Sequence, residues 1–105
     1  MVWPRGPANP RLAMPRIHAF IRGRVQGVFF RASILEQARE LGLIGWVRNR
    51  RDGAVELVAE GDALALDALR RYCKTGPSGA VVRDLEVNDE RETGEFEDFG
   101  LRPEA

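Results

Sequence analysis

One glycine-containing segment in the first third of the chain, residues 23–31 (GRVQGVFFR), has the residue types of an anion-binding loop. A short loop that leads into a helix presents several backbone N–H groups in one direction, and these donors add to the positive end of the helix. Gly23 and Gly27 permit turn angles and a close approach that a side chain would block. The segment therefore predicts a cradle for an anion such as phosphate.

Arg31 follows this loop in what should be the first turn of the helix. A cation there is locally unfavourable by ~0.3–1 kcal/mol, because the helix dipole already places positive charge at that end. A bound phosphate would reverse the effect, since the guanidinium fork matches two phosphate oxygens. The motif alone also allows a plainer interpretation, in which Arg31 is a surface residue and the glycines only form a turn.

The apolar pattern predicts the elements that must position this loop. Ile17, Ala19 and Ile21 alternate with polar or aromatic residues, as in a strand with one buried face. Helices are indicated by apolar stripes such as Phe30, Ile34, Ala38 and Leu41. The expected strands are 16–23, 44–50, 54–59 and 80–87, with a short edge strand at 96–102, and the expected helices are 29–41 and 62–74, the second with Asp62 as N-cap.

The order of these elements predicts the fold class. Two strand–helix–strand units joined by a hairpin make a split βαβ arrangement. We expect a ferredoxin-like α+β sandwich, in which an antiparallel sheet carries both helices on one face. Residues 1–15 hold four of the six prolines and predict a flexible N-terminal extension, with Met14 as an alternative start, so the expected domain is 16–102.

Composition excludes several classes of protein. The 105 residues are enough for one domain, and no apolar run approaches the ~20 residues of a membrane-spanning helix. A single cysteine rules out an internal disulfide, and a single histidine leaves little prospect of a histidine metal site or a Ser-His-Asp triad. The 16 basic and 16 acidic residues balance, which does not indicate a nucleic-acid or membrane surface. We expect no metal, no cofactor, a monomer and a cytoplasmic location.

Further motifs accompany the loop in a fixed order. The segment Gly-Arg-Val-Gln-Gly-Val-x-Phe-Arg is followed by residues 45–49 (GWVRN), by Asp52-Gly53-x-Val55-Glu56, by Glu60-Gly61 and by Gly76-Pro77. This series resembles the acylphosphatase family over about residues 16–101. The resemblance implies hydrolysis of an acyl phosphate, a mixed carboxylic–phosphoric anhydride, to a carboxylate and inorganic phosphate without metal or cofactor.

The resemblance also implies roles for individual residues. Arg31 matches the family arginine that binds phosphate, and Asn49 matches the asparagine that positions the attacking water. The backbone amides that would surround the anion belong to Arg24, Val25, Gln26, Gly27 and Val28. Elementary chemistry agrees, because phosphoryl transfer mainly needs positioning and charge stabilisation, and an amide such as Asn49 can orient water although it is no base.

Other polar residues have simpler expected roles. We expect Arg48, Arg50 and Arg51 to be solvated, with Arg48 and Arg50 on one strand face and Asn49 on the other. Glu56 and Glu60 should belong to a polar sheet face. His18 is expected to be a packed or surface residue, Cys73 a small buried hydrophobe and Trp46 a packing residue.

Two other functions fit this fold class. Ferredoxin-like sheets also bind single-stranded RNA through aromatic residues on central strands, but the basic-aromatic signature of such domains is missing here. An accessory domain like the N-terminal one of hydrogenase-maturation carbamoyltransferases is the second alternative, and it would be expected in a much longer chain.

Overall fold

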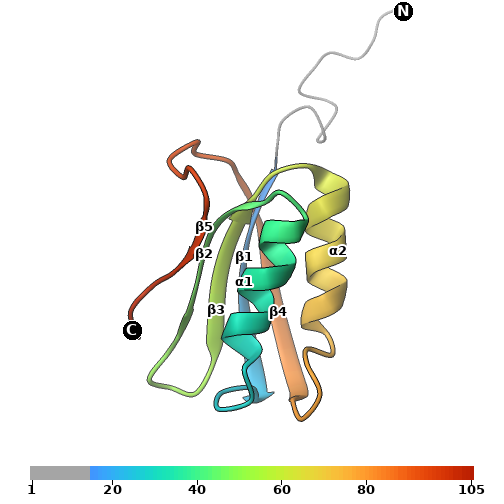
Figure 1. The fold of residues 1–105 in the computed structure, drawn as a ribbon, viewed down its shortest axis with the longest axis vertical. Helices are drawn as coiled ribbons and strands as arrows, with labels where there is room; N and C mark the ends of the chain where they lie inside the picture. Colours follow the sequence, from blue (N-terminus) through green and yellow to red (C-terminus); the bar gives the residue numbers. More distant parts are fainter. Residues whose placement is uncertain (1–14) are drawn as a thin grey trace, which may run out of the picture.

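The computed structural model describes residues 15–105, which form one five-stranded sheet with two helices packed on one of its faces (Figure 1). This arrangement confirms the predicted ferredoxin-like α+β fold. The elements in chain order are β1 (Pro15–Arg24), α1 (Phe30–Glu40), β2 (Ile44–Asn49), β3 (Val55–Glu60), α2 (Ala63–Cys73), β4 (Val81–Arg91) and β5 (Phe99–Leu101).

The sheet has the strand order β4-β1-β3-β2-β5. The four long strands pair antiparallel, as predicted. β5 instead pairs parallel with β2, so the sheet is mixed and the prediction of a purely antiparallel sheet was wrong at this edge. The chain crosses from β4 at one edge of the sheet to the other edge, where β5 lies beside β2 and runs in the same direction.

The strand ends differ from the predicted ones. Pro15 begins β1 and is paired with Arg91, although we expected it to belong to the extension. Proline is tolerated there because the first residue of a strand can forgo its ladder N–H bond. The rest of the expected extension, residues 1–14, lies outside the described residues. β4 continues four residues beyond the predicted end at position 87, because its acidic C-terminal half pairs with β1 without burying apolar side chains.

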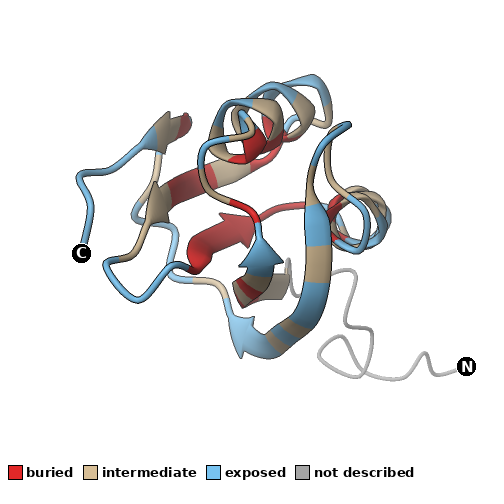
Figure 2. Ribbon diagram, turned by 90° about the horizontal axis from the view of Figure 1, so that it is seen from below, coloured by how far each residue is buried: buried red, intermediate tan, exposed pale blue. Residues whose placement is uncertain are grey.

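The core lies between the helices and the sheet, where Figure 2 shows the buried residues gathered. α1 contributes the expected stripe of Phe30, Ile34 and Ala38, and α2 contributes Leu66, Leu69 and Cys73. Cys73 is 1% exposed, which confirms the prediction of a small buried hydrophobe, and this burial raises the pKa of its thiol to about 12. Asp62 caps α2 as predicted, since its carboxylate accepts from the N–H groups of Leu64 and Ala65 at 3.0 and 3.3 Å.

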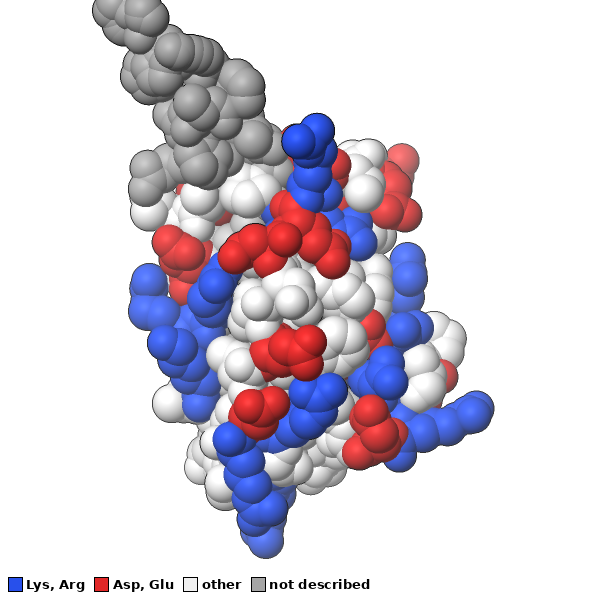
Figure 3. All heavy atoms as spheres, turned by 180° about the vertical axis from the view of Figure 1, so that it is seen from behind, with Lys and Arg blue, Asp and Glu red and all other residues white. Residues whose placement is uncertain are grey.

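Within residues 15–105 no helix covers the opposite face of the sheet, and acidic and basic side chains are intermixed on it (Figure 3). Glu56 and Glu60 lie on this polar face, as expected, but they are only 3% and 1% exposed, so their carboxylates are paired within the protein rather than open to solvent. Glu56 accepts from His18 at 2.6 Å and from the guanidinium groups of Arg48 and Arg50 at 2.8 and 3.3 Å. Arg48 and Arg50 thus pair with Glu56 while their side chains remain 25% and 32% exposed, and Arg51 is exposed as expected.

Both carboxylates have lowered pKa values. Burial by itself would raise the pKa of Glu60, but hydrogen bonds from Thr93, Arg16 and Gly94 outweigh it and hold the pKa below its ordinary range. Burial is likewise outweighed at Glu56, where hydrogen bonds from His18, Arg48 and Arg50 lower the pKa. The charged form of each carboxylate is thus part of the folded structure.

Trp46 lies on the same face and is 8% exposed, which supports its expected packing role. The guanidinium carbons of Arg48 and Arg102 lie 4.8 and 4.6 Å from the centre of its ring. A base that stacked on this ring would have to displace these contacts, which disfavours the RNA-binding alternative.

Candidate functional site

The loop between β1 and α1 leaves the sheet at a bulge. The pairing of β1 with β4 shifts register between Arg22 and Gly23. Gly23 has φ +135°, and a Cβ at this position would collide with the carbonyl oxygen of Val81. Glycine is therefore required at this bulge, where β1 still pairs closely with β4 just before the loop to α1 begins.

The loop ends in a strained residue. Phe29 precedes α1 with φ 62° and ψ 22°, and it is the one non-glycine residue with positive φ in the part of the chain that the structure describes. A left-handed conformation costs a non-glycine residue roughly 1–2 kcal/mol. Phe29 supplies no side-chain hydrogen bond to the first turn of α1, so the N–H groups of that turn keep their capacity to bind an anion.

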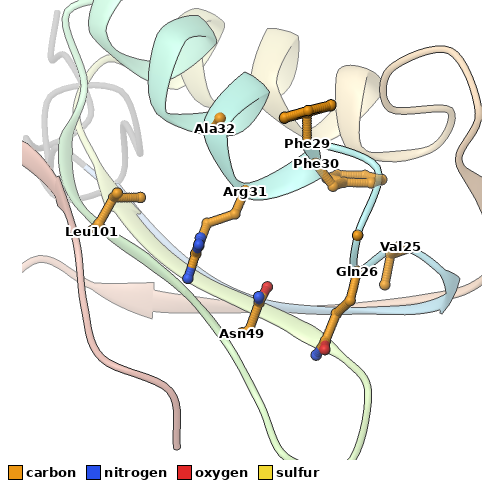
Figure 4. Close-up of a pocket in the computed structure, with 9 residues that line it drawn as sticks. Val25, Gln26, Phe29, Phe30, Arg31, Ala32, Asn49 and Leu101 are labelled. Carbon is orange, nitrogen blue, oxygen red and sulfur yellow. The ribbon is translucent and has the colours of Figure 1, made fainter.

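A cavity of about 350 Å³ opens where this loop, the start of α1 and the end of β2 meet (Figure 4). Arg31 extends from α1 toward Asn49 on β2, and the two side chains point into the same space. Arg31 is the one charged residue among the described residues that line the cavity. The lining consists of Val25, Gln26, Gly27, Phe29, Phe30, Arg31, Ala32, Asn49 and Leu101.

The structure brings together five of the seven residues that the sequence indicated, namely Val25, Gln26, Gly27, Arg31 and Asn49. The other two, Arg24 and Val28, do not line the cavity. Arg24 is exposed at the end of β1, and Val28 packs against the hydrophobic core.

Asn49 faces the cavity with an unsatisfied acceptor. Its Oδ1 atom is buried and has no hydrogen-bond partner among the described residues, although buried polar atoms are almost always paired. The neighbouring Arg48 and Arg50 point to the other face of β2, where they contact Glu56, as the strand alternation predicted. A water molecule that donates a hydrogen bond to Oδ1 would satisfy this oxygen at the edge of the cavity.

Gln26 joins the loop to the hairpin that follows Asn49. Its Nε2 donates to the carbonyl oxygens of Arg50 at 2.7 Å and Ala54 at 2.9 Å. The hairpin itself is closed by Arg50 N–H to Ala54 O at 2.9 Å. The side chain of Gln26 is thus committed to holding two parts of the site together.

Sequence reasoning missed four lining residues: Phe29, Phe30, Ala32 and Leu101. The first three surround Arg31 in the sequence, so their proximity could have indicated them. Leu101 comes from β5, where it pairs with Val47 two residues before Asn49. A three-residue strand carries too little pattern to place it in advance.

Comparisons with known proteins agree with this geometry. The family model described as acylphosphatase matches residues 17–101. The chain belongs to the acylphosphatase family. An acylphosphatase of Methylococcus capsulatus is 54% identical over 88 residues, which cover 84% of this chain and 96% of that protein.

Solved structures show the same relationship. The crystal structure of acylphosphatase from Bacillus subtilis has a TM-score of 0.81 and 36% sequence identity, and the match covers 85% of this chain and 99% of that one. Full-length HypF, solved in a phosphate- and nucleotide-bound form, matches with a TM-score of 0.75 and 28% identity over 86% of this chain but only 12% of its own.

This acylphosphatase is accordingly a hydrolase that acts on acyl phosphates. Among residues 15–105 no helix has the length and apolar character needed to cross a membrane.

Proposed function

We propose that the chain hydrolyses acyl phosphates without a metal ion or cofactor, with Arg31 and the loop amides binding the phosphate and Asn49 positioning the attacking water. One observation carries this assignment. Arg31 and Asn49, from different elements, point into one cavity beside the loop, and the acceptor oxygen of Asn49 is buried there without a partner.

The phosphate would lie against the start of α1. The N–H groups of the first turn and the backbone of the loop through Val25, Gln26 and Gly27 supply donors there, and Arg31 adds a fork that can bind two phosphate oxygens. These groups are fixed before substrate arrives, so they stabilise the charge spread over the phosphoryl oxygens at little reorganisation cost. Arg24 and Val28 would contribute through their backbone alone, as the family resemblance implies.

The reaction would proceed by in-line displacement. Water held by the Oδ1 of Asn49 attacks phosphorus, the bond between phosphorus and the acyl oxygen breaks, and its electron pair leaves with the carboxylate. The proton of the water passes to a phosphate oxygen. Because a carboxylate is a good leaving group, the step needs no strong general acid.

Three variants test these roles. Arg31→Ala should lower the rate by on the order of 10³-fold or more. Arg31→Lys should not restore the rate, because an ammonium group lacks the bidentate fork. Asn49→Ala should lower kcat by on the order of 10²–10³ with KM changed little. The measurement is phosphate release from acetyl or benzoyl phosphate with and without EDTA, and a variant that keeps most of its kcat/KM would refute the corresponding role.

We further propose that the enzyme acts as a monomer in the cytoplasm, on a small-molecule substrate. Only four large apolar side chains are exposed on the described residues, which is too few for an extended apolar interface and supports the monomer. Sedimentation equilibrium at micromolar concentration tests it, and a dimer at that concentration would contradict it.

A further inference from the structure

A buried carboxylate lies on the uncovered face of the sheet, behind the strand end that carries Asn49. Glu56 pairs across the β2–β3 ladder with Arg48, the residue before Asn49. The side chain of Asn49 points into the cavity, whereas those of Arg48 and Arg50 point to the opposite face of β2 (Figure 4). Glu56 is thus outside the cavity and close in the ladder to the residue that should orient water.

One oxygen of Glu56 holds both chain neighbours of Asn49. Its Oε1 accepts from Nε of Arg48 at 2.8 Å and from Nη1 of Arg50 at 3.3 Å. The chain is therefore tied to the same atom one residue before and one residue after Asn49. Because the backbone of Asn49 lies between these two contacts, a shift of Asn49 would have to lengthen at least one of them.

The two arginines can transmit this restraint because aromatic rings limit their freedom. The guanidinium carbon of Arg48 lies 4.8 Å from the centre of the Trp46 ring. That of Arg50 lies 5.4 Å from the centre of the Phe20 ring. Each guanidinium group is thus attracted to a ring as well as to the carboxylate, which favours one arrangement of each long side chain.

Glu56 is itself held firmly. It belongs to β3, which lies between β1 and β2 and has every residue buried. Its second oxygen, Oε2, accepts from Nε2 of His18 on β1 at 2.6 Å. The carboxylate therefore connects the strand end at Asn49 to the two central strands of the sheet.

A second buried carboxylate on the same strand provides a comparison. Glu60 lies opposite Ile44, at the start of β2 and five residues from Asn49. Its hydrogen bonds come from Arg16 and from residues 93–94. Burial of a charged carboxylate in β3 is thus common to both ends of the strand, but contact with the neighbours of Asn49 belongs to Glu56.

We infer that Glu56 is a positioning residue for hydrolysis, which acts through Arg48 and Arg50 to fix the amide of Asn49 where it holds the attacking water in line. The inference rests on the proposed function, in which Asn49 orients that water. Replacement of the carboxylate by a neutral amide would leave two guanidinium groups directed at one uncharged atom, so they should repel each other and separate. A displacement of about 1 Å in a positioned group costs on the order of 10²-fold in rate.

Glu56→Gln tests the inference, with Glu60→Gln as the matched control. We expect Glu56→Gln to lower kcat for benzoyl phosphate by about 10- to 100-fold and to keep the inhibition constant of inorganic phosphate within about threefold, since the phosphate-binding groups belong to α1 and its loop. Glu60→Gln should keep kcat within about twofold of wild type, because it lies far from the site. An unchanged kcat in folded Glu56→Gln would overturn the inference.

Arg50→Met provides a second variant if Glu56→Gln does not fold. It removes one of the two contacts at a side chain that is partly exposed. It should show the same fall in kcat with unchanged phosphate inhibition, but to a smaller extent. Full activity in Arg50→Met and in Arg48→Met would contradict the inference.

A double-mutant cycle separates positioning from a general loosening of the fold. If Glu56 acts through Asn49, then Glu56→Gln should change the residual kcat of Asn49→Ala by less than about threefold. The same fold-loss in both backgrounds would show that Glu56 merely maintains the structure, and it would overturn the inference.

A measurement without turnover distinguishes this inference from the proposed function. In ¹⁵N NMR the side-chain amide signal of Asn49 should move, or its order parameter should fall, in Glu56→Gln, and both should keep their wild-type values in Glu60→Gln. If Asn49→Ala keeps most of its kcat, the proposed role of Asn49 in hydrolysis fails, and the NMR signal still decides whether Glu56 holds that side chain in place. A signal that Glu56→Gln leaves unchanged would refute the positioning role.

Discussion

The two hydrogen bonds that Gln26 donates to the β2–β3 hairpin form a clamp that should be needed for both stability and turnover. Gln26→Met keeps the length of the side chain and removes both of its hydrogen bonds, to Arg50 O and Ala54 O. The carbonyl of Arg50 keeps the N–H of Gly53 as a partner, and the carbonyl of Ala54 keeps the N–H of Arg50. The variant therefore loses two hydrogen bonds but leaves neither carbonyl without a partner. At ~0.5–1.5 kcal/mol each, the variant should be less stable by about 1–3 kcal/mol.

The effect on turnover should be separable from the effect on binding. Without the clamp, the strand end that carries Asn49 can move relative to the loop, and a displacement of about 1 Å in a positioned group costs on the order of 10²-fold in rate. Inhibition by inorganic phosphate should change much less, because Arg31 and the first-turn amides belong to α1. We therefore expect a fall in kcat of about 10- to 100-fold, with the inhibition constant of phosphate within about threefold of wild type.

Urea denaturation and steady-state kinetics measure the two effects, with Gln37→Met on α1 as the matched control. Gln26→Glu provides a further check, because only a protonated carboxyl could donate to one of the carbonyls. Its activity relative to wild type should rise as the pH is lowered. An unchanged kcat in a destabilised Gln26→Met would refute the positioning role, and parallel loss of kcat and phosphate affinity would show that Gln26 orders the loop instead.

The remaining predictions concern the sheet. Because Glu60 has a lowered pKa in the folded state, the unfolded chain binds more protons as the pH falls below about 4.5, so stability should drop with acidification through the folded-state pKa. Glu60→Gln should flatten this dependence in urea midpoints measured between about pH 3 and 6; an unchanged slope would contradict the assignment. Gly45→Ala should destabilise the fold by roughly 2–4 kcal/mol, since a Cβ there would collide with the carbonyl of Val58 at φ +140°. A loss below about 0.5 kcal/mol in the same assay would show that the sheet accommodates the methyl group.

Much of the fold follows from local sequence pattern. The alternation in β1 and the stripes of α1 and α2 are strong because each element buries one face against a single core. Sequence also indicated that Asn49 and Arg48 point to opposite faces, since strand alternation alone decides it. Val25, Gln26, Gly27 and Arg31 were predicted for a similar reason, because they are close together in the chain, whereas Phe29, Phe30 and Ala32 beside Arg31 were missed.

What the sequence did not reveal depends on contacts distant in the chain. The burial of Glu60 requires Arg16 and the segment at Thr93 and Gly94, which are 44, 33 and 34 residues away. The chain crosses from one edge of the sheet to the other before β5. The parallel pairing of β5 with β2, and the position of Leu101 beside the cavity, depend on this crossing. Gln26 likewise bonds to Arg50 and Ala54 in the hairpin, which lie 24 and 28 positions further along the chain. Spacing rules for helices and strands do not reach over such separations.

The shortness of β5 has a consequence for how the site responds to heat. β5 is a three-residue edge strand whose first residue, Phe99, is anchored in the core, whereas Leu101 at its end is 52% exposed. Its exposed end should open locally at a lower free energy than the core of the sheet. Opening would carry Leu101 away while Arg31 and Asn49 keep their places on α1 and β2. Warming should therefore open the cavity on its Leu101 side before it stops hydrolysis, and amide exchange at positions 99–101 should rise ahead of exchange in β3.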